Sequence, residues 1–244
     1  KYNIDKSLRM NKSTQAYEVI VLGAGVAGIY QIKCLKDLGT RALLLVADED
    51  LGGTWFRNRY PGARFDSESY TYGYSFSKEL FNEWHWKERF SSQPENLRYL
   101  NFVTDKFDLR SYMRFNARVK SMEWSEEDRL WTIQAQNGAT YLTRFVITGV
   151  GVLSVATPPK IEGMESFKGD SFHTYWWPKE SVPFKDRKVG IIGTGATGIQ
   201  VISEIADQVG ELQLSQRRPN WSVPLNNSFI ADEALAVIRP RCVV

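Results

Sequence analysis

Two stretches of the chain share one order of apolar and polar positions. Residues 17–22 (YEVIVL) are a short, largely apolar run that predicts a buried strand. A glycine-rich segment follows, and then IYQIKCLKDLG, whose spacing predicts a helix capped by Gly39. Residues 41–46 (RALLLV) predict a second strand. The same order returns with KVGII at residues 188–192, the helix IQVISEIADQVG and a strand at 211–215, so a β-α-β unit is present twice.

The region between the two copies mixes a helix with further strands. The pattern predicts a helix over residues 94–107 and strands over 113–124, 130–135 and 140–147. Asn-Gly at 137–138 predicts a hairpin turn that joins the last two strands. The expected class is therefore α/β, with two dinucleotide-binding (Rossmann-like) units, three-layer parallel sheets and a β-hairpin or meander, the second unit being incomplete.

Composition and charge limit the classes of partner and the cellular setting that we expect. The 31 Lys and Arg barely exceed the 28 Asp and Glu, and no basic run interleaves with aromatic residues, so a nucleic-acid partner is not expected. Cys34 and Cys242 lie far apart, which favours a reducing, cytoplasmic setting without a disulfide framework or metal site. The N-terminal residues are polar and charged and do not resemble a secretory leader, so secretion is not expected. The sequence has no run of about 18 or more apolar residues, so a membrane-spanning helix is not expected either. Nothing in the pattern indicates the oligomeric state.

Both copies carry a G-x-G-x-x-G motif between strand and helix. Glycines at this spacing permit a tight turn, a close approach of backbone to a pyrophosphate, and close packing of helix on strand. The phosphates then lie at the helix N-terminus. Two such motifs predict two nucleotides, a flavin dinucleotide (FAD) and a nicotinamide dinucleotide that feeds it hydride. The predicted contacts are Gly23, Gly25 and Gly28 in the first copy, and Gly193, Thr194, Gly195, Thr197 and Gly198 in the second.

The second strand of each copy indicates how the adenosine ribose is bound. An acidic residue is expected at the end of the first copy's second strand, and Val46 stands there instead. Asp48 or Glu49 from the following loop can replace it, or both are simply solvated. After the second copy come Arg217 and Arg218, whose guanidinium groups suit a 2′-phosphate and favour NADPH, unless they are ordinary surface arginines.

Two longer motifs carry a family resemblance. Residues 52–66 read GGTWFRNRYPGARFD and resemble the G-G-x-W-x-x-x-x-Y-P-G-x-x-x-D signature of class B flavoprotein monooxygenases. Residues 167–178 read FKGDSFHTYWWP and are similar to the F-x-G-x-x-x-H-x-x-x-W fingerprint of Baeyer-Villiger monooxygenases. Each fixed position of both motifs matches, in the right order relative to the glycine motifs.

The resemblance implies a reaction and a set of site residues. NADPH reduces FAD, the reduced flavin captures O2 as a C4a-peroxide, and this species attacks a ketone to give an ester or lactone. Asp66 would hold an active-site arginine, although a turn or N-cap aspartate is the alternative. His173 would couple domain movement to catalysis, the alternatives being a general base or a hydrogen-bonded structural histidine. The signature also implies cofactor contacts from Gly52, Gly53, Thr54, Trp55, Tyr60 and Asp66.

The domain division follows from these sites. We expect residues 1–156 to be the N-terminal part of an FAD-binding domain and 157–244 to be a partial NADP-binding domain, because a doubly wound domain needs more strands than one β-α-β unit. Two alternatives stay open: a flavin-containing monooxygenase that oxygenates nitrogen or sulfur, and a non-catalytic nucleotide-binding remnant. A disulfide reductase is disfavoured because no C-x-x-C motif accompanies the first glycine motif.

Overall fold

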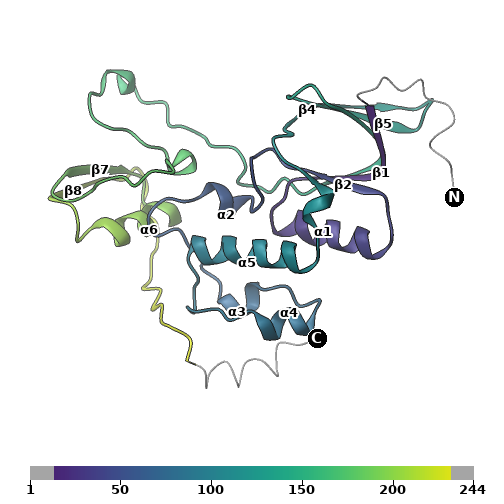
Figure 1. The fold of residues 1–244 in the computed structure, drawn as a ribbon. Coiled ribbons are helices and arrows are strands. Elements are labelled where there is room, and N and C mark those ends of the chain that lie inside the picture. The colour runs from purple at the N-terminus through teal and green to yellow at the C-terminus, as the bar shows by residue number, and fades with distance from the viewer. Residues whose placement is uncertain (1–13, 232–244) are drawn as a thin grey trace. The chain divides into compact units, whose positions relative to one another are not determined.

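The computed structural model describes residues 14–231, which form two compact units (Figure 1). Within the described range, the first unit comprises 14–56 and 100–155, and the second comprises 57–99 and 156–231. The N-terminal residues and Cys242, which entered the prediction of a reducing, non-secreted setting, lie outside the described residues. The predicted division near residue 156 into cofactor domains stays a prediction.

The first unit is built on a mixed six-stranded sheet in the order β3-β2-β1-β6-β5-β4. β1 pairs in parallel with both β2 and β6, and β2 pairs in parallel with β3. The strands β4, β5 and β6 pair antiparallel as a meander. The strands are β1 (Thr14–Leu22), β2 (Ala42–Leu45), β3 (Met113–Arg114), β4 (Val119–Ser125), β5 (Leu130–Ala135) and β6 (Thr140–Thr148).

The meander confirms the predicted hairpin, but the strand predicted over 113–124 is wrong. The turn between β5 and β6 is closed by Gly138 N, which donates to Ala135 O at 3.1 Å. Residues 113–124 form two strands at opposite edges of the sheet, β3 and β4. They are separated at Asn116, whose φ of +53° lies in the left-handed region that asparagine tolerates. Because Asn116 N then donates to Asp48 O, the chain turns away instead of continuing one strand.

The core of the first unit lies around its parallel strands. Ile20 and Val21 on β1 and Leu44 on β2 are fully buried, as expected for strands covered on both faces. Helix α1 (Val26–Asp37) returns the chain between β1 and β2. Gly39 follows the helix at a φ of +66°, and its N–H donates to Lys36 O at 2.9 Å, so the predicted C-terminal cap is confirmed.

The turn-rich region after Gly52 contains three short helices that the sequence pattern did not predict. These are α2 (Thr54–Arg57), α3 (Ser69–Tyr72) and α4 (Lys78–Glu83). None is longer than six residues, which is too short for an apolar periodicity to develop. The longer helix predicted over 94–107 is confirmed as α5 (Gln93–Lys106).

The second unit contains the repeated β-α-β order. β7 (Lys188–Ile192) and β8 (Glu211–Ser215) pair in parallel, and α6 (Ala196–Ile205) connects them. Buried aromatic rings pack elsewhere in this unit, with Trp86 and Tyr99 centroids 4.8 Å apart. The α/β class with two β-α-β units is thus confirmed. Along 14–231, no helix has the length and apolar character to cross a bilayer, and no three His, Cys, Asp or Glu side chains gather as a metal site.

Candidate functional site

The first glycine motif forms a tight connection from β1 into α1. Gly23 has a φ of +97°, and its N–H donates to Leu45 O at 2.9 Å, so the turn is fixed at the carboxyl end of β2. A Cβ on Gly28 would overlap the carbonyl oxygen of Gly23. Glycine at this position therefore lets the helix lie against the turn, which is the role expected of the third glycine in a dinucleotide motif.

The middle glycine of this motif faces residues 52–53 of the signature. Gly25 is the N-cap of α1, with an ordinary extended backbone, and the nearest atom to an added Cβ is Gly53 Cα at 3.8 Å. Gly52 N donates to Ala24 O at 2.8 Å, which brings residues 52–53 beside the turn. The structure therefore brings Gly25, Gly52 and Gly53 together at the N-terminus of α1. The first-turn N–H groups of a helix have no partner within the helix and suit an anion.

Gly149 is a third component of this turn, and the sequence reasoning missed it. Its N–H donates to Leu22 O at 2.8 Å, and a Cβ added to Gly23 would lie 2.7 Å from Gly149 O. A sequence signal was available, because Gly149 comes two residues after the end of the strand predicted over 140–147. Three chain segments, the 23–28 turn, 52–53 and Gly149, thus meet at the carboxyl ends of the parallel strands, where ligands bind in α/β sheets.

The candidate ribose-binding residues after β2 and residues 52–55 of the signature lie in the first unit, whereas Tyr60 and Asp66 of the signature belong to the second. Val46 is buried at the end of β2, Asp48 is half-buried and Glu49 is exposed. Trp55 is buried on α2 and Thr54 is exposed. Asp48 is therefore the less exposed of the two acidic residues after β2, and its contact with a ribose stays a prediction.

The second glycine motif repeats the geometry of the first. Gly193 has a φ of +101°, and its N–H donates to Ser215 O at 2.8 Å, the last residue of β8. A Cβ on Gly198 would overlap Gly193 O, as at the third glycine of the first motif. Gly195 is the N-cap of α6 with a φ of −71° and a ψ of −179°, and an added Cβ there would meet nothing within 4 Å. At both turns a Cβ on the middle glycine would thus meet no atom closer than 3.8 Å.

Two polar side chains that the sequence did not indicate fix the second turn. Gln216 Nε2 donates to Thr194 Oγ1 at 2.8 Å, and Asn220 Nδ2 donates to Thr194 O at 2.9 Å. Both belong to the segment after β8 that also carries Arg217 and Arg218, whose side chains are exposed. The segment that follows β8 therefore contacts the glycine turn through Gln216 and Asn220, and it also carries the two exposed arginines.

Tyr60 of the signature contacts helix α6 within the second unit. Its hydroxyl donates to Gln200 Oε1 at 2.9 Å. Burial raises the pKa of Tyr60 above its usual 10.0, and a hydrogen bond with Thr197 opposes part of this rise. The structure thus brings Tyr60 together with Thr197 of the second glycine motif, and a contact of Tyr60 with either cofactor stays a prediction.

The fingerprint histidine is half-buried and hydrogen-bonded within its own turn. His173 Nδ1 accepts a hydrogen bond from Tyr175 N at 3.1 Å and caps the 3-10 turn η4 (Thr174–Trp176). Arg57 of the signature donates from Nη1 to Tyr175 Oη at 2.8 Å. The two family motifs therefore meet within the second unit through Arg57 and Tyr175.

The two predicted catalytic residues are not brought into contact. Asp66 is exposed at the end of the signature loop, whereas His173 lies in the fingerprint segment. Among the described residues, no hydrogen bond or ion pair joins Asp66 to His173. Their catalytic roles stay predictions.

Comparison with known proteins identifies the family to which these motifs belong. The sequence matches the flavin-binding monooxygenase-like family over residues 16–232, and the chain belongs to that family. It is 46% identical over 232 residues to 2-oxo-Delta(3)-4,5,5-trimethylcyclopentenylacetyl-CoA monooxygenase of Pseudomonas putida, across 93% of this chain and 43% of that protein. It is 39% identical over 229 residues to acetone monooxygenase (methyl acetate-forming) of Gordonia sp., across 94% of this chain and 43% of that protein.

A solved structure agrees with these matches. The crystal structure of OTEMO in complex with FAD and NADP superposes with a TM-score of 0.88 at 46% identity, and the match covers 93% of this chain and 43% of that one. The chain thus spans less than half the length of the relatives that it matches.

Proposed function

We propose that this chain is the cofactor-binding part of an NADPH- and FAD-dependent monooxygenase of the Baeyer-Villiger type. The complete protein would insert one oxygen atom of O2 next to a ketone carbonyl to give an ester or lactone, and the second oxygen atom would leave as water while NADPH is oxidised to NADP+. The ketone and O2 are its small-molecule partners, and the cytoplasm is its expected setting. The relatives support this proposal, since one is named for forming methyl acetate from acetone.

The observation that carries the proposal is the surroundings of the two middle glycines. Gly25 and Gly195 have ordinary backbone conformations and space for a Cβ, so packing within the chain gives no reason to prefer glycine to alanine at either position. A diphosphate that lies against the helix N-terminus does give a reason, because a Cβ would stand between its oxygens and the backbone N–H groups. Two such positions support two dinucleotides.

The two sites are assigned by what surrounds each turn. We assign FAD to the turn that contains Gly25, because residues 52–53 of the flavoprotein signature lie beside it. NADPH is assigned to the turn that contains Gly195, because Arg217 and Arg218 follow its second strand and suit a 2′-phosphate. The division near residue 156 into FAD-binding and NADP-binding parts belongs to this proposal. OTEMO supports the pairing, since its structure holds FAD and NADP together.

The chain's own residues would bind and orient the cofactors. Bound FAD would carry electrons from NADPH to O2. Gly52, Gly53 and Trp55 would line the flavin, and Asp66 would orient a cationic side chain near it. His173 would hold the turn that places Tyr175 against Arg57, which is a positioning role and not proton transfer.

The experiment that tests the proposal begins with the flavin. The purified chain, reconstituted with FAD and desalted, is expected to retain a flavin absorbance band and to bind NADP+ more tightly than NAD+. The complete protein is then given a cyclic ketone, an amine and a sulfide, each with NADPH, and the products are identified by mass spectrometry. An ester or lactone supports the proposal, whereas an N-oxide or sulfoxide alone supports the heteroatom-oxygenating alternative. A chain that FAD cannot reconstitute supports the non-catalytic remnant.

A further inference from the structure

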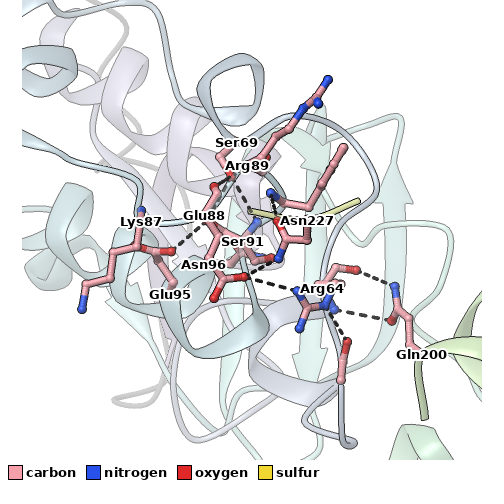
Figure 2. A network of polar contacts seen from close by, with 12 residues as sticks. Arg64, Ser69, Lys87, Glu88, Arg89, Ser91, Glu95, Asn96, Gln200 and Asn227 are labelled. Carbon is pink, nitrogen blue, oxygen red and sulfur yellow. Dashed lines mark hydrogen bonds and ion pairs between the residues drawn. The ribbon is translucent and has the colours of Figure 1, made fainter. Parts of the chain in front are cut away.

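Gln200 connects the second glycine motif to the signature loop. It lies on α6, two residues after Gly198, and within residues 14–231 its side-chain amide forms hydrogen bonds to the loop formed by residues 57–66. Its Oε1 accepts from Tyr60 Oη at 2.9 Å and from Arg64 N at 3.4 Å, and its Nε2 donates to Arg64 O at 2.9 Å. Figure 2 shows Gln200 reaching across to the backbone of Arg64. One side-chain amide therefore holds two points of the loop.

The loop is shaped to lie directly on this helix. Gly62 has a φ of +75°, and a Cβ added there would lie 2.5 Å from the backbone oxygen of Gln200. The Tyr60 hydroxyl also bonds to Thr197, which is inside the glycine motif. Tyr60, Gly62 and Arg64 thus contact the first turns of α6, the part of the helix closest to a bound diphosphate.

The far side of the loop is fixed as well. Arg64 Nη1 forms an ion pair with Glu88 Oε2 at 3.2 Å, and Arg64 pairs with Ser92 as an isolated antiparallel bridge. Glu88 Oε2 also accepts from Asn227 Nδ2 at 2.6 Å (Figure 2). The loop therefore lies between α6 and the 88–92 segment. A shift of α6 relative to that segment would break the contacts of the loop either with Gln200 or with Glu88 and Ser92.

We propose that Gln200 is a positioning residue that couples dinucleotide binding at residues 193–198 to the placement of the signature loop that carries Asp66. This inference rests on the proposed function of the second site. A ligand that orders the N-terminus of α6 also orders the loop, because the helix is rigid and its side chains hold the loop at several points. The coupling is reciprocal, so a loop that is free of the helix weakens dinucleotide binding by the same factor.

Hydrogen exchange with the full chain tests this coupling. NADP+ is added to the wild type and amide exchange is measured over residues 58–66, with FAD affinity measured in parallel. NADP+ is expected to slow exchange in this loop at least tenfold. Gln200→Ala is expected to abolish that protection and to raise the NADP+ Kd about tenfold, which corresponds to about 1.4 kcal/mol, while the FAD Kd stays within twofold of the wild type. The matched control is Gln208→Ala, because the Gln208 side chain is exposed and its Nε2 donates to Glu204 O one turn earlier.

A milder variant keeps the test decisive if Gln200→Ala does not fold. Tyr60→Phe retains the ring and removes only the hydroxyl bonds to α6, so partial loss of loop protection and an NADP+ Kd raised about threefold are expected. The coupling is overturned if Gln200→Ala and Tyr60→Phe both show the same loop protection and the same NADP+ affinity as the control Gln208→Ala. An equal loss of FAD and NADP+ affinity would also overturn it, since that marks a general structural role. A wild-type chain that binds FAD but not NADP+ overturns the assignment of the second site and the coupling together, whereas NADP+ binding without any change at residues 58–66 overturns the coupling alone.

Discussion

Replacing Gly195 by alanine separates the folding role of the second glycine motif from its binding role. The new Cβ would meet no atom within 4 Å, and the φ of −71° and ψ of −179° suit any residue. We therefore expect the free energy of unfolding to change by less than about 0.5 kcal/mol, as for a surface substitution. The methyl group would nevertheless stand about 1.5 Å in front of the backbone, where the diphosphate would lie.

The expected loss of affinity follows from the hydrogen bonds that the methyl group displaces. A hydrogen bond to a charged group contributes about 1.5–3 kcal/mol. Loss of one such bond therefore raises the Kd for NADP+ by roughly ten- to a hundredfold. Gly198→Ala is the matched contrast, because its Cβ would overlap the carbonyl oxygen of Gly193, whose N–H is fixed to Ser215 O at 2.8 Å. That variant is expected to lose about 1–3 kcal/mol of unfolding free energy through overpacking.

Urea denaturation followed by tryptophan fluorescence measures the free energy of unfolding, and isothermal titration calorimetry measures NADP+ binding. Gly195→Ala is expected to keep the unfolding free energy of the wild type and to bind NADP+ more weakly. Gly198→Ala is expected to lose unfolding free energy. The reasoning is refuted if Gly195→Ala binds NADP+ as tightly as the wild type, because no diphosphate would then approach this glycine. It is also refuted if Gly195→Ala unfolds as readily as Gly198→Ala, since the glycine would then serve the fold.

Three further predictions concern the second unit. Replacing Arg217 and Arg218 together by alanine is expected to weaken NADP+ binding more than tenfold and NAD+ binding less than threefold, measured by calorimetry, and an equal loss for both would count against a 2′-phosphate contact. Asn227→Ala removes one hydrogen bond to the Glu88 carboxylate and one from Phe90 N. A loss of about 1–3 kcal/mol in urea is expected, and an unchanged midpoint would contradict it. Burial raises the pKa of Tyr74 above 10.0. Above that pH the Tyr74 phenol loses a proton in the unfolded chain and keeps it in the folded chain, so this group lowers the unfolding free energy by about 1.4 kcal/mol per pH unit. Burial also raises the pKa of Tyr99, which adds to the decline. Tyr74→Phe should make this decline less steep, and an equally steep decline in that variant would exclude a contribution from Tyr74.

Local patterns predicted the elements that local forces stabilise. Strands at residues 130–135 and 140–147 and the helix over 94–107 were predicted within about two residues of their observed ends. The strand predicted over 113–124 failed because a left-handed Asn116 interrupts a run that reads as continuous. The short helices between 54 and 83 had no periodicity to reveal them.

The sequence likewise predicted only part of the candidate site. The glycine spacing indicated both turns, because a tight strand-to-helix connection is encoded within six consecutive residues. Gly149 was missed, since its role depends on the pairing of β6 with β1. Gln216 and Asn220 were missed because a side-chain hydrogen bond to a turn more than 20 residues earlier leaves no mark on hydrophobic periodicity.

The sequence by itself determined the two β-α-β units, the glycine turns at residues 23–28 and 193–198, and the family, because these depend on neighbouring residues and on short motifs. Only the tertiary structure decided that residues 57–99 pack with 156–231, and that Tyr60 and Arg64 of the signature are held by Gln200. The hydrogen bond from Tyr60 to Gln200 joins residues 140 positions apart. Such a contact is selected by how whole elements pack, which no local pattern of apolar and polar residues specifies.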